Sequence, residues 1–192
     1  MLLVLDRLDW ELRESATVRL MCLRWRNIHD GGCNTLRVCY RVTGERVGAL
    51  CARLPALTEI ELTSRSLTDE GLGAVAELTS LTHLDLYGCS VTDKGLSAVA
   101  ALTSLTQLDL AHCPLVRVEG VRAVAERTAL TYLGLGSCEL TDAGLQHLSN
   151  LKQLNLTDCS TTEEAEEELR QQIPGLVIEH WEEQDSDEED WE

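Results

Sequence analysis

The stretch Leu81-Thr-His-Leu84-Asp-Leu86-Tyr-Gly-Cys89 decides the fold, because close copies of it recur along the chain. The copies start at residues 33, 57, 81, 105, 130, 151 and 173, so successive starts are 24, 24, 24, 25, 21 and 22 residues apart. Self-similarity at one period of about 20–50 residues indicates a repeat protein, in which each unit stacks on the next. The composition agrees with this, since 35 of the 192 residues are Leu and none is Phe.

Each copy is predicted to begin with a short strand followed by a turn. Leu84 and Leu86 occupy alternate positions, so both point to the same side of the strand. One unit cannot bury that side alone, and its stability comes from contacts with neighbouring units. Four copies carry a Cys after the strand, where a small residue with a weak thiol donor meets backbone carbonyls of the turn. The expected structural ladder consists of Cys89, Cys113, Cys138 and Cys159.

The second half of each unit is predicted to be helical. The pattern Thr-Asp-x-Gly-Leu follows the turn at residues 68–72, 92–96 and 141–145, and it supplies an N-cap Thr and an Asp for the first helical turn. The unit that starts at residue 130 lacks three residues in this half, which predicts a shorter helix after Leu145. In the next unit Glu166 takes the place of a buried Leu, so that helix is expected to face water on a side that the others bury.

The repeated pattern resembles the leucine-rich repeat, L-x-x-L-x-L-x-x-C/N-x-L. The resemblance implies an α/β fold, a right-handed leucine-rich-repeat solenoid over residues 31–180. About seven parallel strands would line its concave face and helices its convex face, with a short helical cap at the N-terminus. The stretch 176–178 would be the last strand. Residues 181–192 are expected to form a disordered tail, because the acidic residues there repel one another.

Residues 1–30 lie before the repeats. Within them, Val18-Arg-Leu-Met-Cys22-Leu-Arg-Trp25-Arg26-Asn-Ile28 resembles the second half of an F-box, which ends in a Val-Cys-x-x-Trp-Arg motif. Leu8-Asp-Trp-Glu-Leu12 is similar to the opening of that module, although its Pro is missing. The Cys-containing repeats also look like those of F-box/leucine-rich-repeat proteins, and similar repeats occur in bacterial proteins without an F-box.

The F-box resemblance implies a role as a substrate receptor of an SCF-type ubiquitin ligase, which takes part in ubiquitin-dependent protein catabolism. The N-terminal helices would bind the ligase adaptor and the concave face would hold the target protein. The candidate adaptor-binding residues are Leu8, Leu12, Val18, Met21, Cys22 and Trp25. Two alternatives remain. Residues 1–30 would serve only as a cap over the first repeat, or the chain would be a free-standing scaffold whose acidic face and tail bind a basic protein.

The charge is unevenly distributed. The formal net charge is −17, made up of +3 over residues 1–56, −7 over residues 57–160 and −13 over residues 161–192. This balance argues against a nucleic-acid or anionic-membrane binder, because such binding uses Lys and Arg. No apolar run approaches the roughly 18 residues of a membrane span, and the apolar opening ends at Asp6, too early for a secretory signal core. We therefore expect a cytoplasmic or nuclear protein that binds other proteins.

The concave face is the predicted binding surface, since parallel sheets are normally covered on both faces. Tyr87 and Tyr132 are candidate anchors, because Tyr is enriched at binding hot spots. The acidic residues form a stripe that predicts a basic or polar ligand segment. The alternative is that these side chains only keep the face soluble. The candidate partner-binding residues are Glu59, Glu61, His83, Asp85, Tyr87, Gln107, Asp109, Tyr132, Gln153 and Asn155.

The sequence does not favour an enzyme, a metal site or a cofactor. A zinc site from Cys22, His29, Cys33 and Cys39 is disfavoured because no C-x-x-C pair is present. Disulfides are disfavoured by the expected reducing compartment. A catalytic set of Cys89, His83 and Asp85 has the wrong geometry, since the Cys is expected to point inward and the other two outward. No phosphate-binding Gly-rich motif is present.

Overall fold

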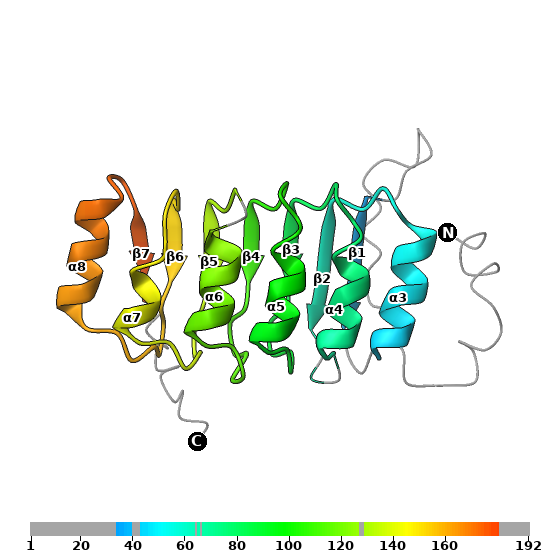
Figure 1. Cartoon of the computed structure of the whole chain (residues 1–192), viewed down its shortest axis with the longest axis horizontal. Helices are drawn as coiled ribbons and strands as arrows, with labels where there is room; N and C mark the ends of the chain where they lie inside the picture. The colour runs from blue at the N-terminus through cyan, green and yellow to red at the C-terminus, as the bar shows by residue number, and fades with distance from the viewer. Residues whose placement is uncertain (1–33, 40–42, 64, 66, 127–128, 181–192) are drawn as a thin grey trace, which may run out of the picture.

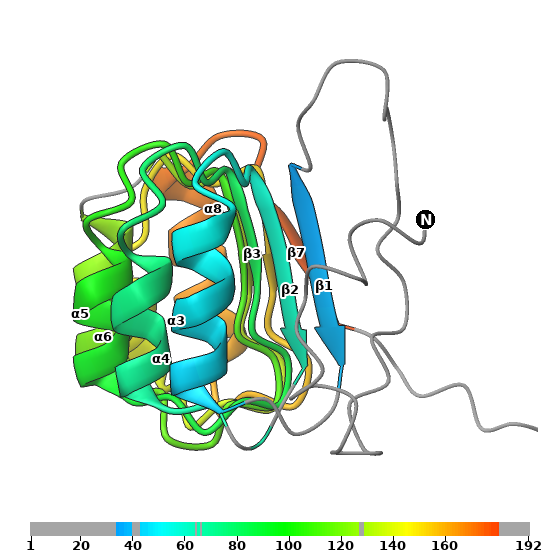
Figure 2. The same cartoon turned by 90° about the vertical axis from the view of Figure 1, so that its right-hand side faces the viewer.

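A computed structural model describes residues 34–180 apart from residues 40–42, 64, 66 and 127–128. Strands and helices alternate along this part of the chain, with all strands in one layer and all helices in a second (Figures 1 and 2). The elements, labelled as in Figure 1, are β1 Thr35–Cys39, α3 Gly44–Arg53, β2 Glu59–Thr63, α4 Asp69–Val75, β3 His83–Asp85, α5 Asp93–Val99, β4 Gln107–Asp109, α6 Val118–Ala125, β5 Tyr132–Gly134, α7 Asp142–Leu145, β6 Gln153–Asn155, α8 Glu163–Gln172 and β7 Val177–Glu179.

The strands form a single seven-stranded sheet in chain order, from β1 to β7, and every neighbouring pair is parallel. The register follows the sequence repeat, so equivalent residues of successive units lie side by side. Leu84, for example, pairs with Ile60 on one side and Leu108 on the other. The predicted α/β solenoid with strands on one face and helices on the other is therefore confirmed.

The core lies between the sheet and the helix layer. Leu84 and Leu86 are both buried, as their alternate positions predict, and the helical face of Leu96 and Val99 closes the same space from the other side. The equivalent residues of the neighbouring units continue this arrangement as one contiguous apolar core. Each unit thus covers the apolar face of the next, which is the source of stability in a stacked repeat.

Aspartates at the helix starts connect neighbouring units. The carboxylate of Asp69 accepts hydrogen bonds from the backbone N–H and the hydroxyl of Thr92 in the next unit, at 2.8 and 2.7 Å. Asp142 bonds Thr162 in the same two ways, at 2.8 and 3.1 Å. The Asp residues expected to favour their own helix therefore also fix the start of the following one. Sequence spacing alone does not reveal this second role.

Two ladders of side-chain hydrogen bonds run through the turns. The thiols of Cys89, Cys113, Cys138 and Cys159 each donate to a backbone carbonyl of the preceding unit, at 2.9 to 3.1 Å. The predicted cysteine ladder is confirmed. A second ladder that the sequence does not reveal joins Thr82, Thr106 and Thr131, whose hydroxyls each donate to the carbonyl of the Thr one unit earlier.

The later units depart from the common form. Helix α7 has four residues and ends at Leu145, so the shortened unit does carry the shortest helix in the described part of the chain. Strand β7 pairs with β6 and extends the sheet as expected, although it begins and ends one residue later than the predicted stretch 176–178. Residues 1–30, for which a helical cap is predicted, and the tail at residues 181–192 lie outside the described residues.

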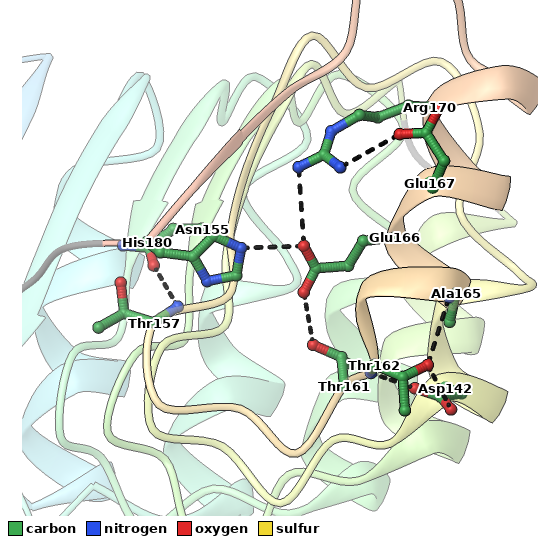
Figure 3. Close-up of polar contacts among 10 residues, drawn as sticks. All are labelled: Asp142, Asn155, Thr157, Thr161, Thr162, Ala165, Glu166, Glu167, Arg170 and His180. Atoms are coloured by element: carbon green, nitrogen blue, oxygen red, sulfur yellow. Dashed lines mark hydrogen bonds and ion pairs between the residues drawn. The ribbon is translucent and has the colours of Figure 1, made fainter.

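One prediction for the last helix is wrong. The sequence places Glu166 on a water-facing side of α8, but only 5% of it is exposed. Its carboxylate accepts a hydrogen bond from Thr161 at 2.9 Å, lies 2.9 Å from Nε2 of His180, and lies 3.7 Å from the guanidinium of Arg170 (Figure 3). Burial of a carboxylate is tolerated when charged and polar partners surround it. Arg170 lies one turn later on α8, but Thr161 and His180 lie outside this helix, so the pattern of α8 alone could not reveal the full set of partners.

Candidate protein-binding face

The surface of the sheet opposite the helices is called the open face here, because no helix of the described part covers it (Figure 2). It is the face that the sequence predicts to be concave. Two rows of side chains cross it, two residues apart along each strand. One row contains Glu59, His83, Gln107, Tyr132 and Gln153, and the other contains Glu61, Asp85, Asp109, Gly134 and Asn155.

All ten candidate partner-binding residues belong to this face. Nine lie on strands at positions that alternate with buried core residues, and Tyr87 follows β3 closely. The structure therefore brings the predicted residues together. Their part in binding stays a prediction. Two small residues, Ala111 after β4 and Gly134 on β5, are buried in this part of the sheet.

Two residues of the first strand, β1, bond to the carboxylates of candidate residues on β2, and the sequence did not predict these contacts. The guanidinium of Arg37 forms an ion pair with Glu61 on the neighbouring strand. The hydroxyl of Thr35 donates to the Glu59 carboxylate at 2.9 Å. A signal is present in the sequence, since residues 35 and 37 precede residues 59 and 61 by one period of 24. The copy that contains them matches the pattern weakly, so its outward residues do not stand out.

Three side chains of the second row also shape the ends of their strands. The Oδ1 atoms of Asp85, Asp109 and Asn155 accept hydrogen bonds from the backbone N–H two residues later, at 2.8, 2.8 and 2.9 Å. This local bond is the usual reason for Asp or Asn at a turn. Because Asn155 makes it as well as the two aspartates do, the negative charge is not needed for the turn.

The charge of Asp85 is disfavoured by its surroundings. Burial raises the pKa of Asp85 above its ordinary value, and the negative charges of Asp109 and Glu61 add to the rise. The Tyr87 N–H and, more weakly, the charge of Arg37 offset part of it. Like charges on neighbouring groups and loss of water both disfavour the ionised form. At neutral pH the negative charge of Asp85 is therefore held at a cost to stability.

We predict that Asp85→Asn stabilises the protein at pH 7, by on the order of 0.5 kcal/mol. A carboxyl whose pKa is raised on folding costs stability once it is ionised, and this cost is absent below its unfolded value of about 3.8. The gain should therefore shrink as the pH falls toward that value. Urea unfolding of both proteins at several pH values measures the difference. A variant that is less stable than the parent at pH 7 would contradict the assignment.

The two candidate tyrosine anchors differ in their surroundings. Tyr87 is 47% exposed and its ring packs edge-on against His112 of the next unit, with ring centroids 4.9 Å apart. Tyr132 is half-buried and its hydroxyl donates to Asp109 at 3.3 Å. Burial, followed by the charge of Asp109, raises the pKa of Tyr132 to about 12, so the phenol is neutral at physiological pH. His112 is not among the residues that the sequence predicts for this face.

The ladder cysteines are not placed for nucleophilic chemistry. Burial raises the pKa of Cys113 and of Cys138 to about 12, which keeps the thiols protonated at neutral pH. Cys89 is fully buried behind the sheet, whereas His83 and Asp85 lie on the open face. The geometric objection to a catalytic set of these three residues is therefore confirmed. That the protein is not an enzyme stays a prediction.

Other chemical predictions fall partly outside the described residues. Cys22, His29 and Cys33 of the disfavoured zinc set lie there, as do the six candidate adaptor-binding residues, Leu8, Leu12, Val18, Met21, Cys22 and Trp25. Within the described ranges, no group of three or more His, Cys, Asp or Glu side chains is arranged to hold a metal ion. In those same ranges, no helix has both the length and the apolar character needed to cross a bilayer.

The pattern of the middle units matches a known family. The profile of the family described as leucine-rich repeat matches three successive segments, residues 77–100, 101–125 and 128–149. These segments are leucine-rich repeats. They coincide with the units in which the cysteine ladder and the buried leucines are most regular. This match does not show F-box character.

A solved structure shows the same fold for the leucine-rich-repeat region. A leucine-rich-repeat protein of Leptospira interrogans is similar with a TM-score of 0.54 and 23% identity, over 76% of this chain and 36% of that protein. Internalin C2 of Listeria monocytogenes gives a TM-score of 0.49 and 22% identity, over 76% of this chain and 70% of that one. The chain thus spans little more than a third of the Leptospira protein. No curated protein matches the sequence significantly.

Proposed function

We propose that this leucine-rich-repeat domain is a protein-binding module whose open face holds the partner. Leucine-rich repeats generally act in protein–protein interaction, and stacked repeats create extended surfaces suited to it. The observation that carries the proposal is the uncovered face of the parallel sheet. Parallel sheets are normally buried on both faces, whereas here one face presents two rows of polar and aromatic side chains.

The size of this face suits a peptide or a small domain. Seven strands at about 4.8 Å spacing span about 30 Å. The side chains across that width include the candidate anchor Tyr87 and the polar pair Gln107 and Gln153. A standard protein interface buries about 800 Å² on each partner, and a face of this width has room for a contact of that order.

A photo-crosslinking experiment tests the proposed location of the partner. A photoreactive amino acid is placed at Gln107 on the open face or, as the matched control, at Ser97, which is exposed on the helix side. We expect covalent adducts with partner proteins to form predominantly from position 107 in the cells that make the protein. Equal or stronger adduct formation from position 97 would overturn the proposal.

We further propose that the chain acts as a substrate receptor of an SCF-type ubiquitin ligase in the cytoplasm or nucleus. The support is the resemblance of residues 18–28 to the end of an F-box and the position of that motif directly before the repeats. In this role residues 1–30 bind the ligase adaptor, the open face holds the target for ubiquitylation, and the chain performs no chemistry itself.

Co-purification with the adaptor tests the ligase role. The full chain is compared with a form that lacks residues 1–30, and the melting of both is followed by circular dichroism. We expect the full chain to retain the adaptor and the shortened, folded form to lose it. If the full chain does not bind the adaptor, the ligase role is wrong, although the open face remains a candidate site. If the shortened form unfolds, Trp25→Ala in the full chain replaces it.

The alternative to the ligase role is a free-standing scaffold that binds basic proteins. The position of the acidic residues favours this alternative. Residues 161–192 carry a net charge of −13, and residues 179–192 contain nine acidic residues. In this case capture of basic proteins should depend on residues 181–192 and fall steeply with salt, because charge attraction between exposed groups is screened. Glu188→Gln with Glu189→Gln lowers the charge of the tail without shortening it and should weaken capture as well. Capture that changes neither on removal of the tail nor with the two Glu→Gln substitutions would contradict this function.

A further inference from the structure

We propose that the partner presents a basic segment to the open face, and that an arginine or lysine side chain of this segment lies between the carboxylates of Asp85 and Asp109. This inference rests on the proposed function, since it names the chemistry of the partner for the same face. It commits to a segment of another protein as the occupant. The reasons are the balance of charge on the face, its shape, and the neutral hydrogen-bond partners of these two carboxylates.

The open face carries a clear excess of negative charge. Glu59, Glu61, Asp85 and Asp109 lie on three successive strands, and Glu179 lies on β7. Among the strand residues that the structure describes, the basic side chain that faces them is Arg37, and it is already paired with Glu61. A partner with complementary charge would neutralise the remaining carboxylates and be steered to the face during its approach.

Asp85 and Asp109 are held by neutral donors. They are register partners, so their backbones lie directly opposite each other on the adjacent strands β3 and β4, and the charge of Asp109 acts on Asp85. Asp85 accepts the Tyr87 N–H, and Asp109 accepts the Ala111 N–H and the Tyr132 hydroxyl. A cation between the two carboxylates would interact with both at once. The cost of holding negative charge at Asp85 would then be offset.

The shape of the face provides a place for such a side chain. A shallow depression is centred on these strands and is lined by Glu61, His83, Asp85, Gln107, Asp109 and Tyr132. On the next strand the register partner of Asp109 is Gly134, which has no side chain to fill the space. A Cβ atom built on Gly134 would lie 2.7 Å from Oδ1 of Asp109, so the Asp109 carboxylate itself lies over the glycine and the depression extends from there toward β3 and β2.

Other occupants fit the face less well. The tail of the chain itself contains eight acidic residues between positions 181 and 192 and would be repelled by the acidic rows. A nucleic acid would be repelled in the same way by its phosphates. A purely apolar helix finds little to pack against, since the strongly exposed large apolar residues near this face are Tyr87 after β3 and Val177 on the edge strand β7, which lie far apart along the sheet. Charge therefore selects a basic peptide segment.

The substitutions for the test preserve the fold. Asp85→Asn and Asp109→Asn remove two negative charges and keep an Oδ1 acceptor for the turn, and Asn155 shows that the amide makes the same bond. The Tyr132 hydroxyl can accept a hydrogen bond from the new amide after rotation. Two pairs of Glu→Gln changes act as charge-matched controls. One is Glu77→Gln with Glu126→Gln on exposed helix-side residues, and the other is Glu188→Gln with Glu189→Gln in the tail.

The binding probe is a fluorescently labelled peptide in which Arg alternates with Ser, and its neutral control has Gln in place of Arg. Full-length proteins are titrated and the anisotropy of the peptide is followed. We expect the Asp85→Asn, Asp109→Asn protein to bind the Arg peptide at least about tenfold more weakly than the helix-side control, a change of about 1.4 kcal/mol. Neither control pair should weaken binding by more than about twofold, in line with screened surface charges.

Two results would overturn the inference. One is an equal loss of binding in the open-face and helix-side variants, which would mean that net charge alone attracts the peptide. The other is a larger loss in the tail variant, which would place the basic segment on the tail. Neither result affects the crosslinking test at Gln107. If adducts form there and are insensitive to Asp85→Asn with Asp109→Asn, the proposed function stands and only the chemistry of the partner is wrong.

Discussion

Leu108→Ala is expected to lower the free energy of unfolding by about 2–5 kcal/mol, the usual range for a buried Leu. Leu108 is fully buried, and it is the register partner of Leu84 on one side and of Leu133 on the other. Removal of its side chain leaves a cavity in the central unit, where three leucines from successive strands meet. Because each unit is stabilised mainly by its neighbours, the loss weakens the contacts on both sides.

Urea unfolding followed by circular dichroism measures the effect of Leu108→Ala. The matched control is Gln107→Ala, one position earlier on the same strand, where the side chain is exposed on the open face. We expect the control to change the free energy of unfolding by no more than about 0.5 kcal/mol. Similar losses for the two variants would contradict the assignment of inward and outward sides to this strand.

Gly95→Ala is expected to destabilise the protein by about 2–3 kcal/mol, although Ala is normally the better helix residue. A Cβ atom on Gly95 would lie 2.5 Å from Oδ1 of Asp69 and 3.1 Å from a methyl carbon of Leu72. The Asp69 oxygen is not free to move away, because it accepts the backbone N–H of Thr92. The added methyl group therefore either separates α5 from α4 or breaks the bonds that connect the two units.

Gly73→Ala is the matched control for this prediction. Gly73 lies in α4, one unit earlier, and no atom lies within 4 Å of the Cβ that the substitution would add. Ala there should stabilise the protein by about 0.5–1 kcal/mol through helix propensity and the entropy of the unfolded chain. The melting temperature and the urea midpoint should thus both fall for Gly95→Ala and both rise for Gly73→Ala. A shift of the same sign in both would show that close packing is not what requires glycine at position 95.

Most of the candidate face follows from the period of the sequence. Once the repeat is aligned, alternation within each strand places Glu61, Asp85 and Asp109 in one row and Leu84 and Leu108 in the core. What the period does not predict is how these side chains pair. Arg37 with Glu61 and Tyr132 with Asp109 are contacts between different residue types in different units, and they depend on how far each side chain reaches.

The sequence by itself determined the strand order, the parallel register, the cysteine ladder and the shortened helix α7. These features repeat locally, so one unit predicts the next. Only the tertiary structure showed that Glu166 is buried beside His180 and Arg170 (Figure 3) and that Asp69 fixes the start of the following helix. The physical reason is that burial of a charged group depends on the partners that surround it in space. His180 and Thr161 lie outside the helix of Glu166, and Thr92 lies one unit after Asp69, so the pattern of hydrophobic residues within one helix carries no information about these contacts.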